Sequence, residues 1–165
     1  ASGGGGGGGK FSFKSTTGAA KTTTTAAAGA KTGTIATKYS FRCRPQDLFE
    51  CFTVPPRACA YTQSGSARVS PAPDAEFSLY DGLITGKNVA VDAPKTLKQK
   101  WRLRDWPDGH FSDVTLTFEW QADKEYTLLR LRQTNVPGDA VDSTKQGWMR
   151  FFVERIRNVF GYVKV

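Results

Sequence analysis

Two alternating segments joined by a tight turn constrain the fold of this chain most. Residues 96–104 alternate basic with mostly apolar side chains, and residues 113–120 alternate polar with apolar ones. A period of two residues is the spacing of a strand that buries one face. Between them, Pro107-Asp108-Gly109 favours a turn, because proline presets φ and glycine accepts a positive φ. The two segments are therefore predicted to form an antiparallel pair with one polar face and one apolar face.

More strands and two short helices are predicted around this pair. The same kind of patterning indicates strands at residues 38–44, 67–70, 75–80, 83–91 and 125–135. Asp81-Gly82 favours a hairpin turn between two of them. Residues 45–52 are predicted to form a helix with Pro45 in its first turn, and residues 57–61 a second one. Residues 82–88 superficially resemble a phosphate-binding loop, but no helix follows them, so they fit a strand better.

A long amphipathic helix is predicted near the end of the chain. Ser143 and Gln146 have the spacing of a capping box, and Gly161 is suited to a left-handed C-cap. Between them, apolar residues recur at intervals of three and four. Such a helix must cover the apolar face of the sheet. The predicted fold is α+β: an antiparallel sheet of about six or seven strands wrapped on a long C-terminal helix. This is the helix-grip architecture of Bet v 1-like and START-like proteins.

The beginning of the chain differs from the rest in composition. Residues 1–34 are rich in Gly, Ala, Thr and Lys, and they are expected to be a disordered linker, with the folded domain at residues 35–165. The first 40 residues hold five lysines and no acid, which is most of the formal net charge of +8. The basic character of the chain is therefore weak evidence for nucleic-acid binding, and none is expected. A run of seven glycines follows Ala1-Ser2 and no initiator Met is present, which suggests a fragment of a longer protein; processing of a native N-terminus is the alternative.

The cysteines and the absence of targeting segments indicate a reducing compartment. Cys43, Cys51 and Cys59 fit neither a metal-binding pattern nor a paired disulfide framework, and each is expected to be a buried small apolar residue. The sequence holds no signal peptide and no membrane-spanning run. A cytoplasmic monomer without a cofactor is expected.

Four segments of the predicted domain resemble one family. They are residues 77–86 (FSLYDGLITG), 100–111 (KWRLRDWPDGHF), 146–152 (QGWMRFF) and 160–162 (FGY). The chain resembles, from about residue 38 to 165, the C-terminal domain of the activators of the 90-kDa heat shock protein ATPase. The resemblance implies the helix-grip fold and a co-chaperone module that binds the chaperone's ATPase domains and favours their closed conformation. In full activators a separate N-terminal domain precedes this one, and residues 1–40 cannot form it.

A basic outer face of the sheet is the first candidate binding surface. Six cations are expected on one face of three neighbouring strands, with only Glu119 between them: Lys98, Lys100, Arg102, Arg104, Arg130 and Arg132. Such a face would steer an acidic partner, here an acidic surface of the chaperone. The alternative is an ordinary solvated face whose charges contribute little.

The turn after residue 104 is the second candidate. Trp106, Asp108 and His110 could contact the partner, because an exposed tryptophan is a common interface anchor. Alternatively, Trp106 packs on the sheet edge and His110 bonds the turn backbone. The turn chemistry explains Asp108 and His110 without a metal.

The sequence gives little support for catalysis. It has a single histidine, and no spacing suggests a nucleophile and base pair, so no enzymatic activity is expected. The competing hypothesis is a helix-grip domain that binds a small apolar ligand between sheet and helix. Bulky residues at the inward positions favour a packed core instead: Trp101, Leu103, Phe118, Trp120, Trp148 and Phe152.

Overall fold

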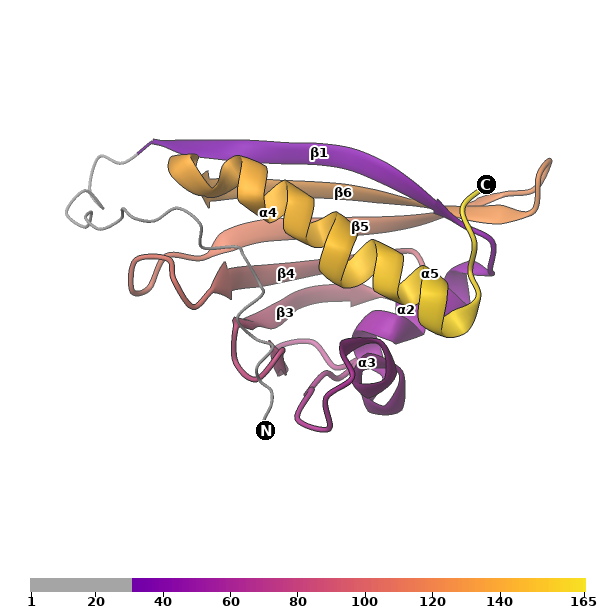
Figure 1. Cartoon of the computed structure of the whole chain (residues 1–165), viewed down its shortest axis with the longest axis horizontal. Helices are drawn as coiled ribbons and strands as arrows, with labels where there is room; N and C mark the ends of the chain where they lie inside the picture. Colours follow the sequence, from indigo (N-terminus) through magenta and orange to yellow (C-terminus); the bar gives the residue numbers. More distant parts are fainter. Residues whose placement is uncertain (1–30) are drawn as a thin grey trace.

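A six-stranded antiparallel sheet forms one layer of the domain, and helices cover one of its faces (Figure 1). The computed structural model describes residues 31–165. The strand order is β1-β6-β5-β4-β3-β2, so consecutive strands are neighbours from β2 to β6 and β1 closes the far edge beside β6. The strands are β1 (Thr32–Phe41), β2 (Glu76–Leu79), β3 (Ile84–Asp92), β4 (Thr96–Leu103), β5 (Ser112–Gln121) and β6 (Tyr126–Pro137). The predicted helix-grip fold is confirmed.

One predicted boundary and one predicted strand need correction. Strand β1 begins at Thr32, so the last residues assigned to the linker belong to the sheet; the rest of that predicted linker lies outside the described residues. Residues 67–70 form no strand, because only Arg68 makes an isolated bridge, with Ser78. This short contact covers the edge of β2, which is only four residues long. Short, locally covered edge strands limit unwanted pairing with other chains.

Two short helices follow β1, as predicted. They are α2 (Pro45–Thr53) and α3 (Pro55–Thr62), and each begins with a proline in its first turn. Proline suits this position because its missing N–H would have no partner inside the helix. Val54 ends the first helix and precedes the second with an extended backbone. The pair packs under the sheet, where the Phe49 ring lies 5.3 Å from that of Phe118 on β5.

The C-terminal helix (residues 141–160) crosses the covered face of the sheet diagonally (Figure 1). It consists of α4 (Val141–Gly147), the π-helical turn η5 (Trp148–Val153) and α5 (Glu154–Phe160), and it follows the 3₁₀ turn η4 (Gly138–Ala140). It ends at Gly161, whose φ of 74° is left-handed, as predicted. The predicted capping box is wrong: Ala140 is the N-cap, and the Ser143 hydroxyl donates to the Ala140 carbonyl from inside the helix. The π-helical turn was not predicted.

Aromatic rings fill the space between the sheet and the C-terminal helix. The Trp148 ring stacks on Trp101 at 5.5 Å between ring centres and lies 4.5 Å from Phe152. Five of the six residues predicted to point inward are buried. The exception is Trp120, which is half-buried at the end of β5 under the Arg44 guanidinium, 4.6 Å from its ring centre. The prediction of bulky inward-facing side chains is thus confirmed at these five positions.

Candidate partner-binding surface

The strand register brings the predicted cations together on one face. On the sheet face away from the C-terminal helix, here called the outer face, Lys98 of β4 lies beside Thr115 of β5, which lies beside Arg132 of β6. The next row places Thr117 beside Arg130, with Lys38 of β1 next to it. The side chains in these rows alternate with buried residues, as a period of two requires. Lys38 is an additional cation that the sequence analysis did not assign to this face.

Two of the predicted cations are paired with acids. The Lys100 ammonium lies 2.5 Å from Asp113, and the Arg130 guanidinium lies 2.7 Å from Glu119. The expectation that only Glu119 lies among the cations is therefore wrong, since Asp113 projects from the same strand. Within the part of the chain that the structure describes, Lys98, Arg132 and Lys38 have no ion pair. The uncompensated positive charge of the outer face therefore lies across the middle of the sheet.

The side chains of Arg102 and Arg104 make hydrogen bonds to backbone carbonyls. The Arg102 guanidinium donates to the carbonyls of Trp106 and Pro107, at 2.6 and 3.2 Å. Strand β4 ends at Leu103, and the Arg104 guanidinium donates to the Asp81 carbonyl at 2.9 Å. Both side chains hold turns at the same end of the sheet. Their guanidinium groups keep their positive charge, since no acid pairs with either of them among the described residues, but they are held by backbone carbonyls.

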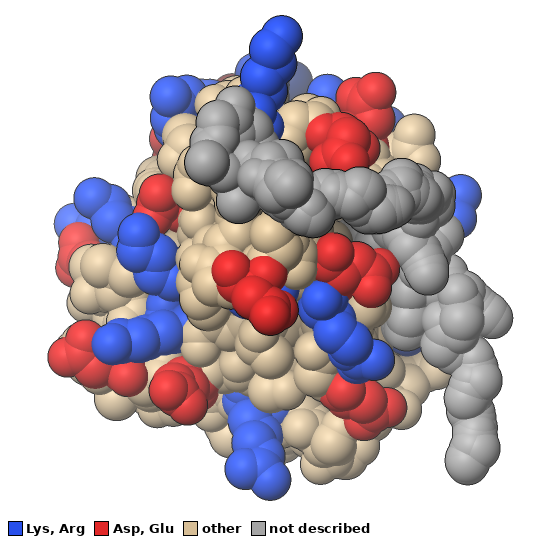
Figure 2. Space-filling view, turned by 90° about the vertical axis from the view of Figure 1, so that its left-hand side faces the viewer, with Lys and Arg blue, Asp and Glu red and all other residues tan. Residues whose placement is uncertain are grey.

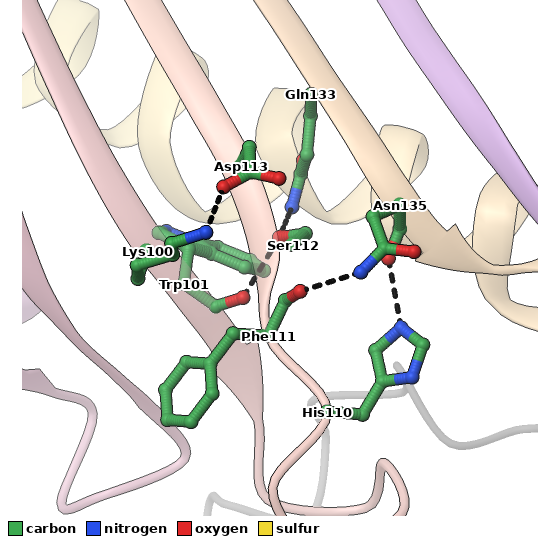
Figure 3. A network of polar contacts seen from close by, with 8 residues as sticks. All are labelled: Lys100, Trp101, His110, Phe111, Ser112, Asp113, Gln133 and Asn135. Carbon is green, nitrogen blue, oxygen red and sulfur yellow. Dashed lines mark hydrogen bonds and ion pairs between the residues drawn. The ribbon is translucent and has the colours of Figure 1, made fainter. Parts of the chain in front are cut away.

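The β4–β5 turn (residues 104–111) is rigid because its side chains bond back to the fold (Figure 3). Nε2 of His110 lies 2.8 Å from the Asn135 carbonyl, which can only accept, so this nitrogen carries the proton. The Asn135 amide donates to the Phe111 carbonyl at 2.9 Å. Trp106 is buried at 6 % exposure and packs 6.0 Å from Trp101. The burial of Trp106 agrees with the packing alternative and excludes an exposed Trp106 anchor, whereas the His110 side chain bonds strand β6 and not the turn backbone.

The exposed aromatic residue of this region is Phe111, at 36 % exposure. The sequence analysis did not select it, although the signal was present. Phe111 directly precedes β5, and continuing the alternation of Asp113 and Thr115 by one step predicts the outer face for it, where it lines a hollow together with Lys100. Asp108 is exposed at the tip of the turn.

The end of the molecule that carries this turn has charges of both signs. Figure 2 shows this end, and acidic and basic side chains are interspersed on it. Mixed charge of this kind gives no field of a single sign. Among the described residues, no group of three or more histidines, cysteines or acids is placed to hold a metal ion.

The thiols are free and mostly unreactive. Cys51 is buried, while Cys43 and Cys59 are half-buried, so the expectation of full burial holds only for Cys51. Burial raises the pKa of the Cys43 and Cys51 thiols to about 12. Both thiols are therefore protonated near neutral pH, where a protonated thiol is a poor nucleophile.

The fold and the surface together define a helix-grip domain with an aromatic interior and a basic outer sheet face. Comparison with known proteins agrees with this fold. Residues 42–161 match the family model described as "Activator of Hsp90 ATPase homolog 1-like protein". The chain belongs to this family. No helix among residues 31–165 is both long and apolar enough to cross a membrane.

Three relatives illustrate the similarity. The "Activator of 90 kDa heat shock protein ATPase homolog 1" of Mus musculus is 33 % identical over 132 residues, covering 79 % of this chain and 38 % of the relative. The homologue of Dictyostelium discoideum is 34 % identical over 131 residues, covering 79 % of this chain and 34 % of the relative. The crystal structure of an Hsp90 activator from Plasmodium falciparum superposes with a TM-score of 0.74 at 27 % identity, covering 80 % of this chain and 99 % of that one. The chain thus spans little more than a third of the two full-length relatives.

Proposed function

We propose that this domain is a co-chaperone module that binds the ATPase domain of the 90-kDa heat shock chaperone through its outer face and helps stimulate the ATPase cycle. The observation that carries the proposal is the family match over the folded domain. The relatives named above are activators of this ATPase. We further propose that the domain works in the cytoplasm as a monomer, and that binding is the part of the activity it contributes. On this proposal it is an activator and not itself an enzyme.

The charge distribution supports the outer face as the contact surface. Lys98 and Arg132 stand on either side of the uncharged Thr115, and neither has an acidic partner in the described structure. Unpaired cations on an exposed sheet attract an acidic surface and mainly accelerate association. The ion pairs of Lys100 and Arg130 are exposed, and such pairs contribute only about 0–1 kcal/mol each, so a partner can exchange them at small cost.

Stimulation requires that the domain distinguish between states of the chaperone. A bound protein shifts a conformational equilibrium only through a difference in affinity for the two conformations. We propose that the closed, hydrolysing conformation presents the complementary acidic surface more completely than the open one. Binding of the domain would then raise the population of that conformation.

A titration with charge-reversed variants tests the proposal. The chain, labelled with ¹⁵N, is titrated with the chaperone's ATPase domain at about 25 mM and about 150 mM salt. We expect shifts of the amide signals at Lys98, Thr115 and Arg132, and weaker binding at the higher salt. The double variant Lys98→Glu/Arg132→Glu should bind at least about tenfold more weakly at low salt.

The matched control changes the net charge equally on the other side of the molecule. Lys145→Glu/Arg150→Glu reverses two exposed cations of the C-terminal helix, for which the described residues provide no ion pair. We expect its affinity to stay within about twofold of the unmodified chain. An equal loss in both double variants would indicate a general charge effect. No binding by the unmodified chain at either salt concentration would overturn the proposed function.

The alternative, an apolar ligand held between sheet and helix, has less support. The Trp148 ring contacts the rings of both Trp101 and Phe152 along the C-terminal helix, and the three rings occupy that space. Gln133 beneath this helix is fully buried and uses its amide to bond Trp148 and Ser112. A site for an apolar ligand would need these contacts to open.

A further inference from the structure

Phe111 is the one aromatic side chain in the exposed class among residues 31–165. An aromatic ring that is exposed just before a strand contributes less to the stability of the fold than a buried ring would. Its ring lies 5.9 Å from the Arg102 guanidinium, which restricts the ring on one side. Exposed aromatics that become buried on association dominate the energy of many protein interfaces.

The position of Phe111 is fixed before any partner arrives. The Asn135 amide holds its carbonyl, and the carbonyl of Asn135 in turn bonds His110 (Figure 3). Arg102 fixes the turn from the other side through the Trp106 and Pro107 carbonyls. A rigid aromatic contact binds at low entropic cost, because little backbone freedom remains to be lost.

Phe111 lies along a groove on the outer face, here called the outer groove. The groove runs from β2 across β3 and β4 to the β4–β5 turn. Its lining includes the hydroxyls of Ser78 and Thr85 and the ring of Phe111. It also includes three cations and two acids, and one of the acids, Glu76, lies directly opposite Lys87 in the strand register: Arg68, Lys87, Lys100, Glu76 and Asp81. Arg68 and Lys87 have no ion pair in the described part of the chain, and Lys100 is paired only with the exposed Asp113. The groove thus combines an apolar contact at one end with three cations along its length, which outnumber the two acids that line it.

This combination fits a polypeptide segment better than a small molecule. The groove is open to solvent, whereas sites for small ligands enclose most of the ligand's surface. Lys100 belongs both to the groove and to the outer face, so the two surfaces are continuous. A partner that docks on the outer face therefore reaches the groove without reorienting.

We propose that the outer groove binds a segment of the chaperone's ATPase domain in which an apolar side chain lies next to an acidic one. The apolar side chain packs on Phe111, and the carboxylate lies among Arg68, Lys87 and Lys100. This inference rests on the proposed function and adds to it the residue that makes the apolar contact. Phe111 contributes to how long the complex lasts, while Lys98 and Arg132 mainly accelerate its formation.

The test compares two exposed apolar residues of the same chain. Phe111→Ser removes the ring from the groove, and Val89→Ser removes an apolar side chain that is 49 % exposed but does not line the groove. Association and dissociation rates with the chaperone's ATPase domain are measured at two salt concentrations. We expect Phe111→Ser to dissociate about tenfold faster with an unchanged salt dependence, and Val89→Ser to stay within about twofold of the unmodified chain.

The outcomes separate this inference from the proposed function. If the unmodified chain binds and Phe111→Ser dissociates at the same rate, the groove assignment is overturned and the proposed function stands. If the unmodified chain does not bind, the proposed function fails, and this inference fails with it. The Trp106 indole N–H signal reports whether the turn remains folded. Where Phe111→Ser disturbs that signal, Lys87→Glu decides, because an unchanged affinity of that variant also overturns the groove.

Discussion

At the scale of single residues, side-chain direction could be predicted and side-chain partners could not. A period of two places Lys98 and Lys100 on one face whatever their neighbours are. The pairing of Lys100 with Asp113 depends on the register between β4 and β5, which the conformation of the β4–β5 turn sets. Arg104 was misplaced because β4 ends one residue before it. Sequence patterns therefore located the charged face, but not the cations that remain unpaired on it.

A glycine in β3 provides a test at this scale. A Cβ on Gly86 would lie 1.9 Å from the Lys100 carbonyl oxygen and 2.6 Å from the Phe77 ring, and the backbone cannot yield to relieve the first contact. We expect Gly86→Ala to lower the free energy of unfolding by about 3 kcal/mol or more, as measured by urea denaturation. Gly65→Ala is the matched control, because nothing lies within 4 Å of the added Cβ there. Equal stabilities for the two variants would contradict this close approach of the strands.

At the scale of elements, a buried polar chain joins three strands to the C-terminal helix. The Trp148 indole donates to Gln133 on β6 at 2.8 Å. Gln133 donates to the Ser112 hydroxyl on β5 at 2.9 Å, and Ser112 donates to the Trp101 carbonyl on β4 at 2.7 Å (Figure 3). Trp148 is also the first residue of the π-helical turn. The sequence predicted the helix and its apolar face, but not this turn, because spacings of three and four occur in both helix types. It also gave Gln133 no special role, since a polar residue in a strand usually faces solvent.

Two glutamines test this chain of hydrogen bonds. Gln133→Leu keeps a similar volume but leaves the Trp148 N–H without its acceptor, so we expect a loss of about 2–3 kcal/mol in the free energy of unfolding. Gln146→Leu is the matched control at an exposed helix position, and we expect a change within about 0.5 kcal/mol. The control also examines the rejected capping box, in which Gln146 would have bonded the helix start. A large loss for Gln146→Leu would restore that box.

At the scale of the whole molecule, the fold could be predicted because every element agreed with one architecture. Strict alternation defined the sheet, and a single amphipathic helix after the last strand had to cover its apolar face. The groove could not be predicted, because Ser78, Lys87 and Phe111 belong to three separate elements that only the tertiary structure brings together. The outer face of the sheet therefore follows from the pattern of single strands, whereas the outer groove depends on how separate elements pack together.

The last prediction concerns the stability of the whole domain at alkaline pH. Burial raises the pKa of six tyrosine and cysteine side chains in the folded state: Tyr39, Cys43, Cys51, Tyr61, Tyr80 and Tyr162. For Cys51 the pKa rises from an ordinary value of 9.0 to about 12. Above about pH 9 the unfolded chain therefore releases protons that the folded chain retains, and the free energy of unfolding falls as pH rises. Urea denaturation at about pH 7.5, 9 and 10.5 should show full stability at the first value and a growing loss at the others.

Cys51→Ala removes one of these groups, so its free energy of unfolding should fall less steeply above about pH 9. At pH 7.5 the variant is less stable than the unmodified chain because of the cavity. Parallel pH profiles for the two proteins would show that the Cys51 thiol does not contribute to the alkaline loss.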